Sequence, residues 1–94
     1  MLTILFRSKI KPELAESYAE LLAEIEPLGV GMPGFVSKKT YVAEDGERLS
    51  LIRWRDRESL DAWRLHPDHQ RAKRLGREHY YESHSLEIFE APES

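Results

Sequence analysis

The sequence of 94 residues contains no cysteine, which excludes disulfides, thiolate nucleophiles, iron–sulfur ligation and cysteine-rich zinc sites. It has no run approaching the ~18 apolar residues of a membrane helix. Its 14 basic residues stand against 17 acidic ones, so there is no excess of positive charge for a nucleic-acid surface. The apolar start, residues 1–6, is shorter than the apolar region of a secretory signal. We therefore expect a cytoplasmic protein that binds neither nucleic acid nor a membrane.

Apolar periodicity predicts a single α+β domain over residues 1–94. The chain is 40% hydrophobic and 33% charged, as is typical of a globular protein. Alternating and three-to-four spacings predict the order β-α-β-β-α-β, the ferredoxin-like pattern with a four-stranded antiparallel sheet. The expected strands are residues 2–10, 35–42, 48–54 and 83–90. Residues 91–94 are expected to form a frayed tail.

Prolines and glycines set the expected ends of the helices. The first helix begins at Pro12, and Pro27 with Gly29 should end it. Asp56 is the expected N-cap of a second helical region. Pro67 requires a break in that region and opens a further helix that runs to about residue 80.

Glycines also mark two expected chain reversals. Residues 29–34 match G-x-G-x-x-G, but a helix precedes these glycines and a strand follows them, the reverse of the dinucleotide-binding arrangement. We therefore expect Gly34 to be a reversal residue that is free to adopt positive φ. The pair Asp45-Gly46 carries the turn signal of a hairpin between the second and third strands.

The strand over residues 48–54 is apolar on both faces, because Leu51, Ile52 and Trp54 are near neighbours. If helices cover one face of the sheet, the other face needs a cover as well. We expect that cover to be a second copy of the chain, packed sheet on sheet with twofold symmetry. Such a homodimer would close two four-stranded sheets into an eight-stranded α/β barrel.

His66 and His69 lie on either side of Pro67 and Asp68 in the sequence, and three interpretations of this cluster are open. His66 and His69 could share a metal, but no third ligand has a fixed spacing, so we expect no metal site. Alternatively, His66 caps the helix that Pro67 opens, and His69 is a hydrogen-bonded, half-buried side chain. In the third interpretation, His69 faces the sheet together with Ala72, where an imidazole that titrates near neutral pH suits proton transfer.

Aromatic residues gather in the same part of the sequence, where they either fill the core or form a flat pocket for a polycyclic ligand. They are Trp54, Trp63, Tyr80 and Tyr81. Arg7 lies within a strand and either pairs with a carboxylate or contacts an anionic substrate. A basic cluster is expected to be the solvated face of a helix. It consists of Arg71, Lys73, Arg74 and Arg77.

Three segments carry a resemblance to a known family. They are Met32-Pro33-Gly34-Phe35, Leu51-Ile52-Arg53-Trp54-Arg55-Asp56 and Ala62-Trp63-Arg64-Leu65-His66-Pro67-Asp68-His69. These segments resemble the antibiotic biosynthesis monooxygenase superfamily, in the branch related to heme-degrading monooxygenases. The resemblance spans nearly the whole chain, and its last segment is the most specific. It implies a dimeric ferredoxin-like α+β barrel with a cavity between sheet and helices in each protomer.

The resemblance implies two activities. Some members oxidise polycyclic aromatic substrates with molecular oxygen and no metal or flavin, and others bind heme and open its ring. The heme branch has three features: an Asn on the first strand, a Trp and an axial His. In this sequence Trp63 matches the Trp, but Lys73 stands at the His position and the chain has no Asn. We therefore predict a cofactor-independent monooxygenase of a small aromatic or quinone-like compound, with heme binding or a non-catalytic ligand-binding dimer as alternatives. Trp63 and His69 are the predicted catalytic residues. The predicted pocket residues are His66, Trp54, Tyr80, Tyr81 and Arg7.

Overall fold

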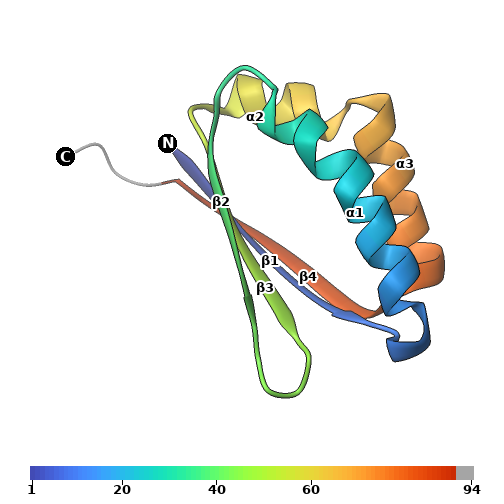
Figure 1. The fold of residues 1–94 in the computed structure, drawn as a ribbon. Helices are drawn as coiled ribbons and strands as arrows, with labels where there is room; N and C mark the ends of the chain where they lie inside the picture. Colours follow the sequence, from blue (N-terminus) through green and yellow to red (C-terminus); the bar gives the residue numbers. More distant parts are fainter. Residues whose placement is uncertain (91–94) are drawn as a thin grey trace.

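The computed structural model describes residues 1–90, which form one antiparallel sheet with helices packed on one of its faces (Figure 1). The strands are β1 (Leu2–Ile10), β2 (Phe35–Val42), β3 (Arg48–Trp54) and β4 (Tyr81–Glu90). The helices are α1 (Ala15–Val30), α2 (Arg57–Arg64) and α3 (Pro67–Leu75), with a 3₁₀ turn η1 (Pro12–Leu14) and a π-helical turn η2 (Gly76–Tyr80). The strands lie in the order β2-β3-β1-β4, which confirms the predicted ferredoxin-like α+β fold. The expected tail over residues 91–94 lies outside the described residues.

The register of the sheet places the apolar positions of β1 and β3 on the face toward the helices. Leu2 pairs with Trp54, and Ile4 pairs with Ile52, so their side chains lie side by side on that face. These residues form the core together with apolar side chains from α1 and α2. The buried members of the core are Leu2, Ile4, Ile25, Trp54, Leu60 and Trp63. The core therefore lies toward one end of the space between sheet and helices.

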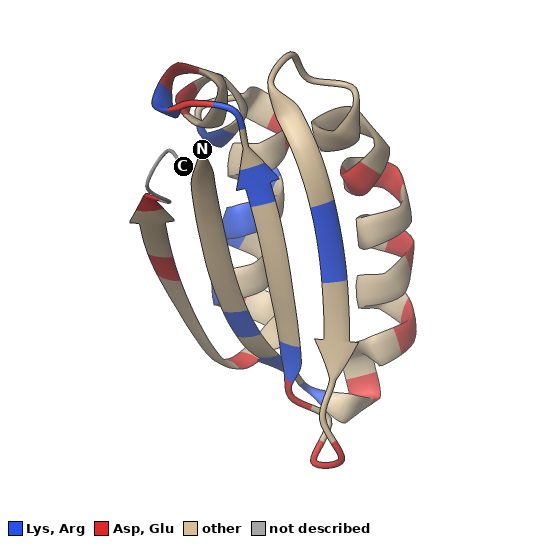
Figure 2. Cartoon of the chain, turned by 90° about the vertical axis from the view of Figure 1, so that its left-hand side faces the viewer, with Lys and Arg blue, Asp and Glu red and all other residues tan. Residues whose placement is uncertain are grey.

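The opposite face of the sheet has no helix over it among residues 1–90 (Figure 2). Leu5, Leu49 and Leu51 are half-buried there, because they alternate with the residues that face the helices. Arg7 and Arg53 lie on the same uncovered face and are exposed. This face is thus a mixture of apolar and cationic side chains. Within residues 1–90, no helix is long and apolar enough to cross a membrane.

The two predicted N-caps are confirmed. The Asp56 carboxylate accepts hydrogen bonds from the Ser59 amide at 2.8 Å and the Ser59 hydroxyl at 2.7 Å, and these bonds lower the pKa of Asp56. The Nδ1 atom of His66 accepts a hydrogen bond from the Asp68 amide at 3.2 Å. The break at His66 and the start of α3 at Pro67 thus fix the direction of α3 relative to α2.

The prediction that Pro27 and Gly29 end the first helix is wrong, because α1 continues through both residues to Val30. A proline near the end of a helix removes one hydrogen-bond donor, and the remaining turn is held by its packing. A Cβ built on Gly29 would lie 3.0 Å from the Trp63 ring, so the missing side chain lets α1 and α2 approach closely. The absence of a side chain at Gly29 therefore allows the close contact between α1 and α2.

The last helix reaches Tyr80 as predicted, but its final turn, η2, is π-helical. The extra residue in this turn brings the ring of Tyr81 over Gly76, where a Cβ would lie 2.5 Å from the ring. Because Tyr81 already pairs with Ile10 of β1, β4 begins two residues earlier than expected.

Gly34 and Gly46 both adopt positive φ, at 87° and 90°, and both were expected at chain reversals. Gly34 leads into β2, and a Cβ there would lie 2.0 Å from the Ser59 hydroxyl oxygen. Gly46 lies at the tip of the hairpin between β2 and β3, and a Cβ there would meet no atom within 4 Å. The two glycines share a backbone conformation but differ in the space around them.

This difference predicts unequal effects of alanine. Gly46→Ala should lower the free energy of unfolding by about 1 kcal/mol, the cost of placing a side chain at positive φ. Gly34→Ala adds an overlap with Ser59, so we expect a loss at least ~2 kcal/mol larger. Chemical denaturation of the two variants measures the difference. Equal losses would show that Ser59 moves aside without cost.

Candidate active site

A cavity of about 390 Å³ lies between the sheet and the helices. Its sheet wall includes Ile4, Ile52 and Trp54, and its helical wall includes Ile25 and Trp63. Small-molecule sites in proteins occupy ~300–1,000 Å³ and are lined mainly by apolar side chains. The cavity therefore has the size and the lining of a site for a small organic molecule.

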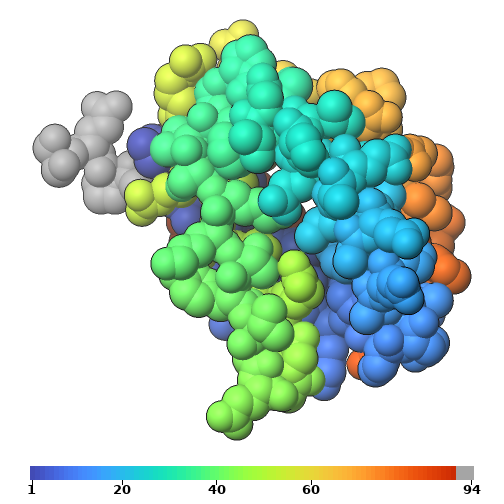
Figure 3. Space-filling model, viewed as in Figure 1, coloured from blue at the N-terminus to red at the C-terminus, as the bar shows by residue number. Residues whose placement is uncertain are grey.

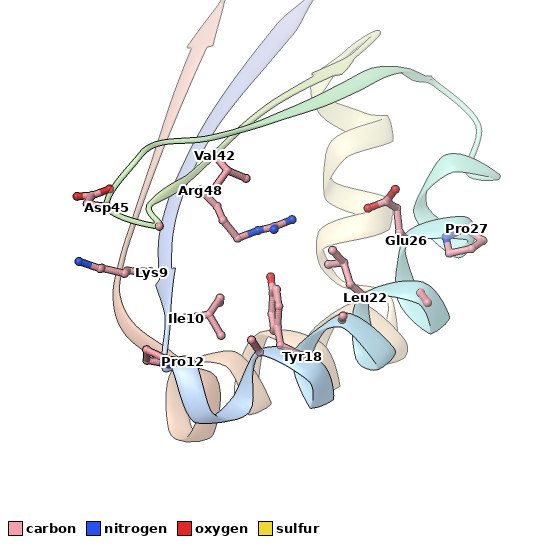
Figure 4. Close-up of a pocket in the computed structure, with 14 residues that line it drawn as sticks. Lys9, Ile10, Pro12, Tyr18, Leu22, Glu26, Pro27, Val42, Asp45 and Arg48 are labelled. Carbon is pink, nitrogen blue, oxygen red and sulfur yellow. The ribbon is translucent and has the colours of Figure 1, made fainter.

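A wider hollow of about 650 Å³ opens between α1 and the hairpin of β2 and β3 (Figure 3). Four of its lining residues, Tyr18, Leu22, Glu26 and Arg48, also line the inner cavity, so the two spaces share a wall. Figure 4 shows Arg48 and Tyr18 pointing into this hollow from opposite walls. The hollow therefore lies beside the inner cavity.

Trp63 and His69 form the centre of the helical wall. Their rings stack with centroids 4.7 Å apart and an interplanar angle of 26°. The turn at His66 and Pro67 positions His69 beneath Trp63, because it starts α3 at a fixed angle to α2. The Nδ1 atom of His69 is buried and has no hydrogen-bond partner among residues 1–90.

The environment of His69 disfavours its charged form. Burial, and after it the positive charge of Lys73, lower the pKa of His69 from 6.5 to about 4. His66 and Lys38 act in the same direction, and the Arg64 carbonyl opposes them. His69 is therefore neutral at pH 7 and able to accept a proton or a hydrogen bond.

Tyr81 lines the cavity from the start of β4. Burial and the neighbouring Tyr18 raise the pKa of Tyr81 well above its usual value, so its hydroxyl stays protonated. Tyr80 is placed differently, because its hydroxyl hydrogen-bonds with that of Ser17 at 2.6 Å. Of the two tyrosines, Tyr81 is thus the one that lines the cavity.

The structure brings together four of the seven predicted site residues. Trp54, Trp63, His69 and Tyr81 line the inner cavity. The other three are absent from its lining: His66 caps α3, Tyr80 bonds to Ser17, and Arg7 lies on the uncovered face of the sheet.

The expectation that the basic cluster is a solvated helix face is confirmed for Arg74 and Arg77, which are exposed, but Lys73 is half-buried; Lys73 and Arg77 also line the cavity. A signal for this was present, since His69, Lys73 and Arg77 are spaced by four residues and successive residues at this spacing share a helix face. Burial, together with the charges of Arg64 and Arg77, lowers the pKa of Lys73. Lys38 and Arg48, from β2 and β3, add two further cations to the walls.

Among residues 1–90, no three His, Asp or Glu side chains gather in a way that could hold a metal ion. His66 uses its Nδ1 atom in the helix cap. The polar side chains of the cavity are instead two imidazoles, two phenols, two serine hydroxyls, one carboxylate and several cations.

A ferredoxin-like sheet whose helices enclose an apolar cavity with a neutral histidine is an α+β architecture with room for a small organic molecule. Residues 1–75 match the family described as "Antibiotic biosynthesis monooxygenase", and the chain belongs to that family.

Two sequence relatives and one solved structure illustrate the match. "Uncharacterized protein YqjZ" of Bacillus subtilis is 30% identical over 81 residues, which are 86% of this chain and 71% of that protein. "Jasmonate monooxygenase ABM" of Pyricularia oryzae is 28% identical over 90 residues, which are 94% of this chain but 42% of the fungal protein. The chain thus spans less than half of that relative.

The solved structure is that of SnoaB, described as a cofactor-independent oxygenase from Streptomyces nogalater. It superposes with a TM-score of 0.81 at 17% identity and covers 99% of this chain and 94% of its own. At this identity the comparison shows a common fold.

The low pKa of His69 predicts acid sensitivity. Between pH 6.5 and about 4 the unfolded chain binds a proton at His69 that the folded chain does not, so the free energy of unfolding falls as the pH falls. The unmodified protein should lose free energy of unfolding between pH 7 and pH 4.5, and in His69→Phe this loss should be smaller by on the order of 2 kcal/mol. Chemical denaturation at both pH values measures it, with His79→Gln, at an exposed position, as the control. Identical pH dependence in His69→Phe and the unmodified protein would contradict the assignment.

Proposed function

We propose that this protein is a small monooxygenase that oxidises an aromatic or quinone-like compound with molecular oxygen and without a bound cofactor. The observation that carries the proposal is the cavity itself, where a neutral imidazole and an indole face an apolar space of about 390 Å³. Membership of the monooxygenase family supports the same chemistry. The names of the fungal relative and of SnoaB are consistent with it.

In this mechanism the substrate supplies the electrons, and the protein makes the substrate a better electron donor. Removal of a proton from an activated CH₂ or OH group turns an aromatic substrate into an electron-rich anion that can react with O₂. His69 is the proton acceptor, because its ring is neutral at pH 7 and faces the cavity. The Tyr81 hydroxyl donates a hydrogen bond to the oxyanion of the substrate, and the Trp63 ring supports the aromatic system.

The overall reaction balances for an anthrone-type substrate. A CH₂ group between aromatic rings becomes a carbonyl, with one oxygen atom of O₂ in the carbonyl and the other in water. The two hydrogens of the CH₂ group leave with that water. The electrons come from the two C–H bonds that break, so no further reductant is required.

Heme, the cofactor of the alternative function, does not fit the residues present. The cavity volume of about 390 Å³ lies near the lower end of the range for small-molecule sites and suits a few fused rings. The position at which the resemblance places an axial histidine holds Lys73, an amine surrounded by other cations. We derive no step through heme.

We also propose that the protein acts as a homodimer through the uncovered face of the sheet. Half-buried leucines on that face, Leu5, Leu49 and Leu51, support a sheet-on-sheet contact between two copies. Exposed aromatic and aliphatic side chains extend the apolar area toward the sheet edges, among them Val36, Tyr41 and Phe89.

Oxygen uptake with anthrone tests the catalytic proposal. We expect one O₂ consumed per anthrone and one labelled oxygen atom in the product when isotopically labelled O₂ is used. His69→Phe should lower kcat/KM by about 10²-fold or more, because general-base catalysis contributes ~10²–10⁴-fold. Trp63→Phe should mainly raise KM, since a smaller ring supports less of the substrate. His79→Gln, outside the cavity, should match the unmodified protein.

Activity that is unchanged in both His69→Phe and Trp63→Phe would remove the site assignment. A saturable Soret shift at one hemin per chain would instead favour the heme alternative. Binding of aromatic ligands without oxygen uptake would favour a non-catalytic ligand-binding protein.

Light scattering at micromolar concentration tests the dimer. The expected mass is about twice the chain mass of 11.0 kDa. Leu51→Lys should shift the protein toward a single chain, because it places a charge in the centre of the proposed interface. Leu65→Lys, at an exposed position outside the sheet, is the matched control. A mass near that of one chain for the unmodified protein would refute the dimer.

A further inference from the structure

The cavity is cationic although the chain as a whole carries a formal net charge of −3. Five basic side chains line it, and a single carboxylate among the described residues, that of Glu26, faces them. Glu26 is already bound by Lys38 at 2.9 Å. The remaining basic side chains are Arg48, Arg64, Lys73 and Arg77. Most of the positive charge around the cavity therefore has no neutralising partner inside it.

Lys73 is the centre of this excess charge. It is half-buried, and within residues 1–90 no carboxylate lies within salt-bridge distance of its ammonium group. Other cations of the same helical layer are paired, because Arg64 contacts Asp61 at 3.2 Å and Arg71 contacts Glu24. Arg64 and Arg77 lie close enough to Lys73 to repel its charge.

An unpaired, half-buried ammonium beside two other cations is unfavourable. An anion placed beside it would gain charge-assisted hydrogen bonds and would relieve this repulsion. Apolar side chains also line the cavity near Lys73, since Trp63 stacks on His69, which precedes Lys73 by one helical turn. A ligand that satisfies both features has a flat apolar body and one anionic group at its edge.

We propose that the substrate of this cavity is an aromatic carboxylate, whose carboxylate group binds Lys73 with Arg64 and Arg77 beside it and whose rings lie against Trp63. This assignment rests on the proposed function for the oxidation step, but the binding itself does not. Lys73 is then the residue that selects carboxylated substrates over neutral ones.

The position of His69 links this anion site to the proton acceptor. Lys73 follows His69 by one helical turn, and its charge is one cause of the low pKa of His69. A bound carboxylate would offset that charge and raise the pKa of His69. Binding of the anionic group and proton transfer would thus be coupled through one lysine.

Isothermal calorimetry with 2-naphthoate and its neutral counterpart 2-naphthamide tests the proposal. We expect the unmodified protein to bind 2-naphthoate about tenfold or more tightly than 2-naphthamide, and this preference should weaken as salt is added. In Lys73→Met the preference should disappear while the affinity for 2-naphthamide stays the same. Lys73→Arg should retain it.

The control is Arg74→Met, which makes the same change in net charge at an exposed neighbouring position outside the cavity. It should keep the preference for 2-naphthoate. Equal affinity for the two probes, no binding of 2-naphthoate at millimolar concentration, or a preference that survives in Lys73→Met would each overturn the proposal.

The two proposals fail in different ways. A Lys73-dependent preference for 2-naphthoate without oxygen uptake from neutral or carboxylated anthrones would leave the anion site standing and remove the monooxygenase. Equal oxygen uptake from neutral and carboxylated anthrones, with no preference for 2-naphthoate, would remove the anion site and leave the monooxygenase.

Discussion

The contact that the rest of the site depends on is the packing of the Trp63 ring between helices. A Cβ on Gly29 would lie 3.0 Å from this ring, and the ring stacks on His69 at 4.7 Å, so one indole joins α1, α2 and α3. The same ring belongs to the buried core and lines the cavity. The core contact that holds the helices on the sheet therefore also holds the candidate base in place. The Trp63 side chain thus both stabilises the packing of the helices and positions His69.

The fold was predictable because its signals are local and repeated. The bounds of β1, β2 and β3, the caps at Asp56 and His66, and the positive φ of Gly34 all follow from spacing or from the backbone preference of one residue. The end of α1 was not predictable in this way. Whether Pro27 and Gly29 stop a helix depends on what packs against the last turn, and here that is Trp63, which lies far away in the sequence.

The candidate site was predictable in part, for a related reason. Helical spacing correctly brought His69 toward the cavity, and the aromatic pattern brought Trp54, Trp63 and Tyr81 to its walls. Lys73 was assigned to solvent because charged residues on a helix usually lie there. Its four-residue spacing from His69 carries the opposite signal. The charge of a side chain says little about which way the side chain points. Its position along the helix says more, because residues four apart lie on the same face.

The placement of cations beside a buried imidazole has a consequence for the chemistry. With a pKa of about 4, His69 is a weak base, and its neutral ring adds no further charge to the cavity. An anionic ligand beside Lys73 would make His69 more basic at the moment when a substrate is present to give up a proton. The bound anion and the substrate oxyanion would both stabilise the protonated imidazole formed in that step. In the proposed site, the unpaired lysine would thus couple the charge of the ligand to the base strength of His69.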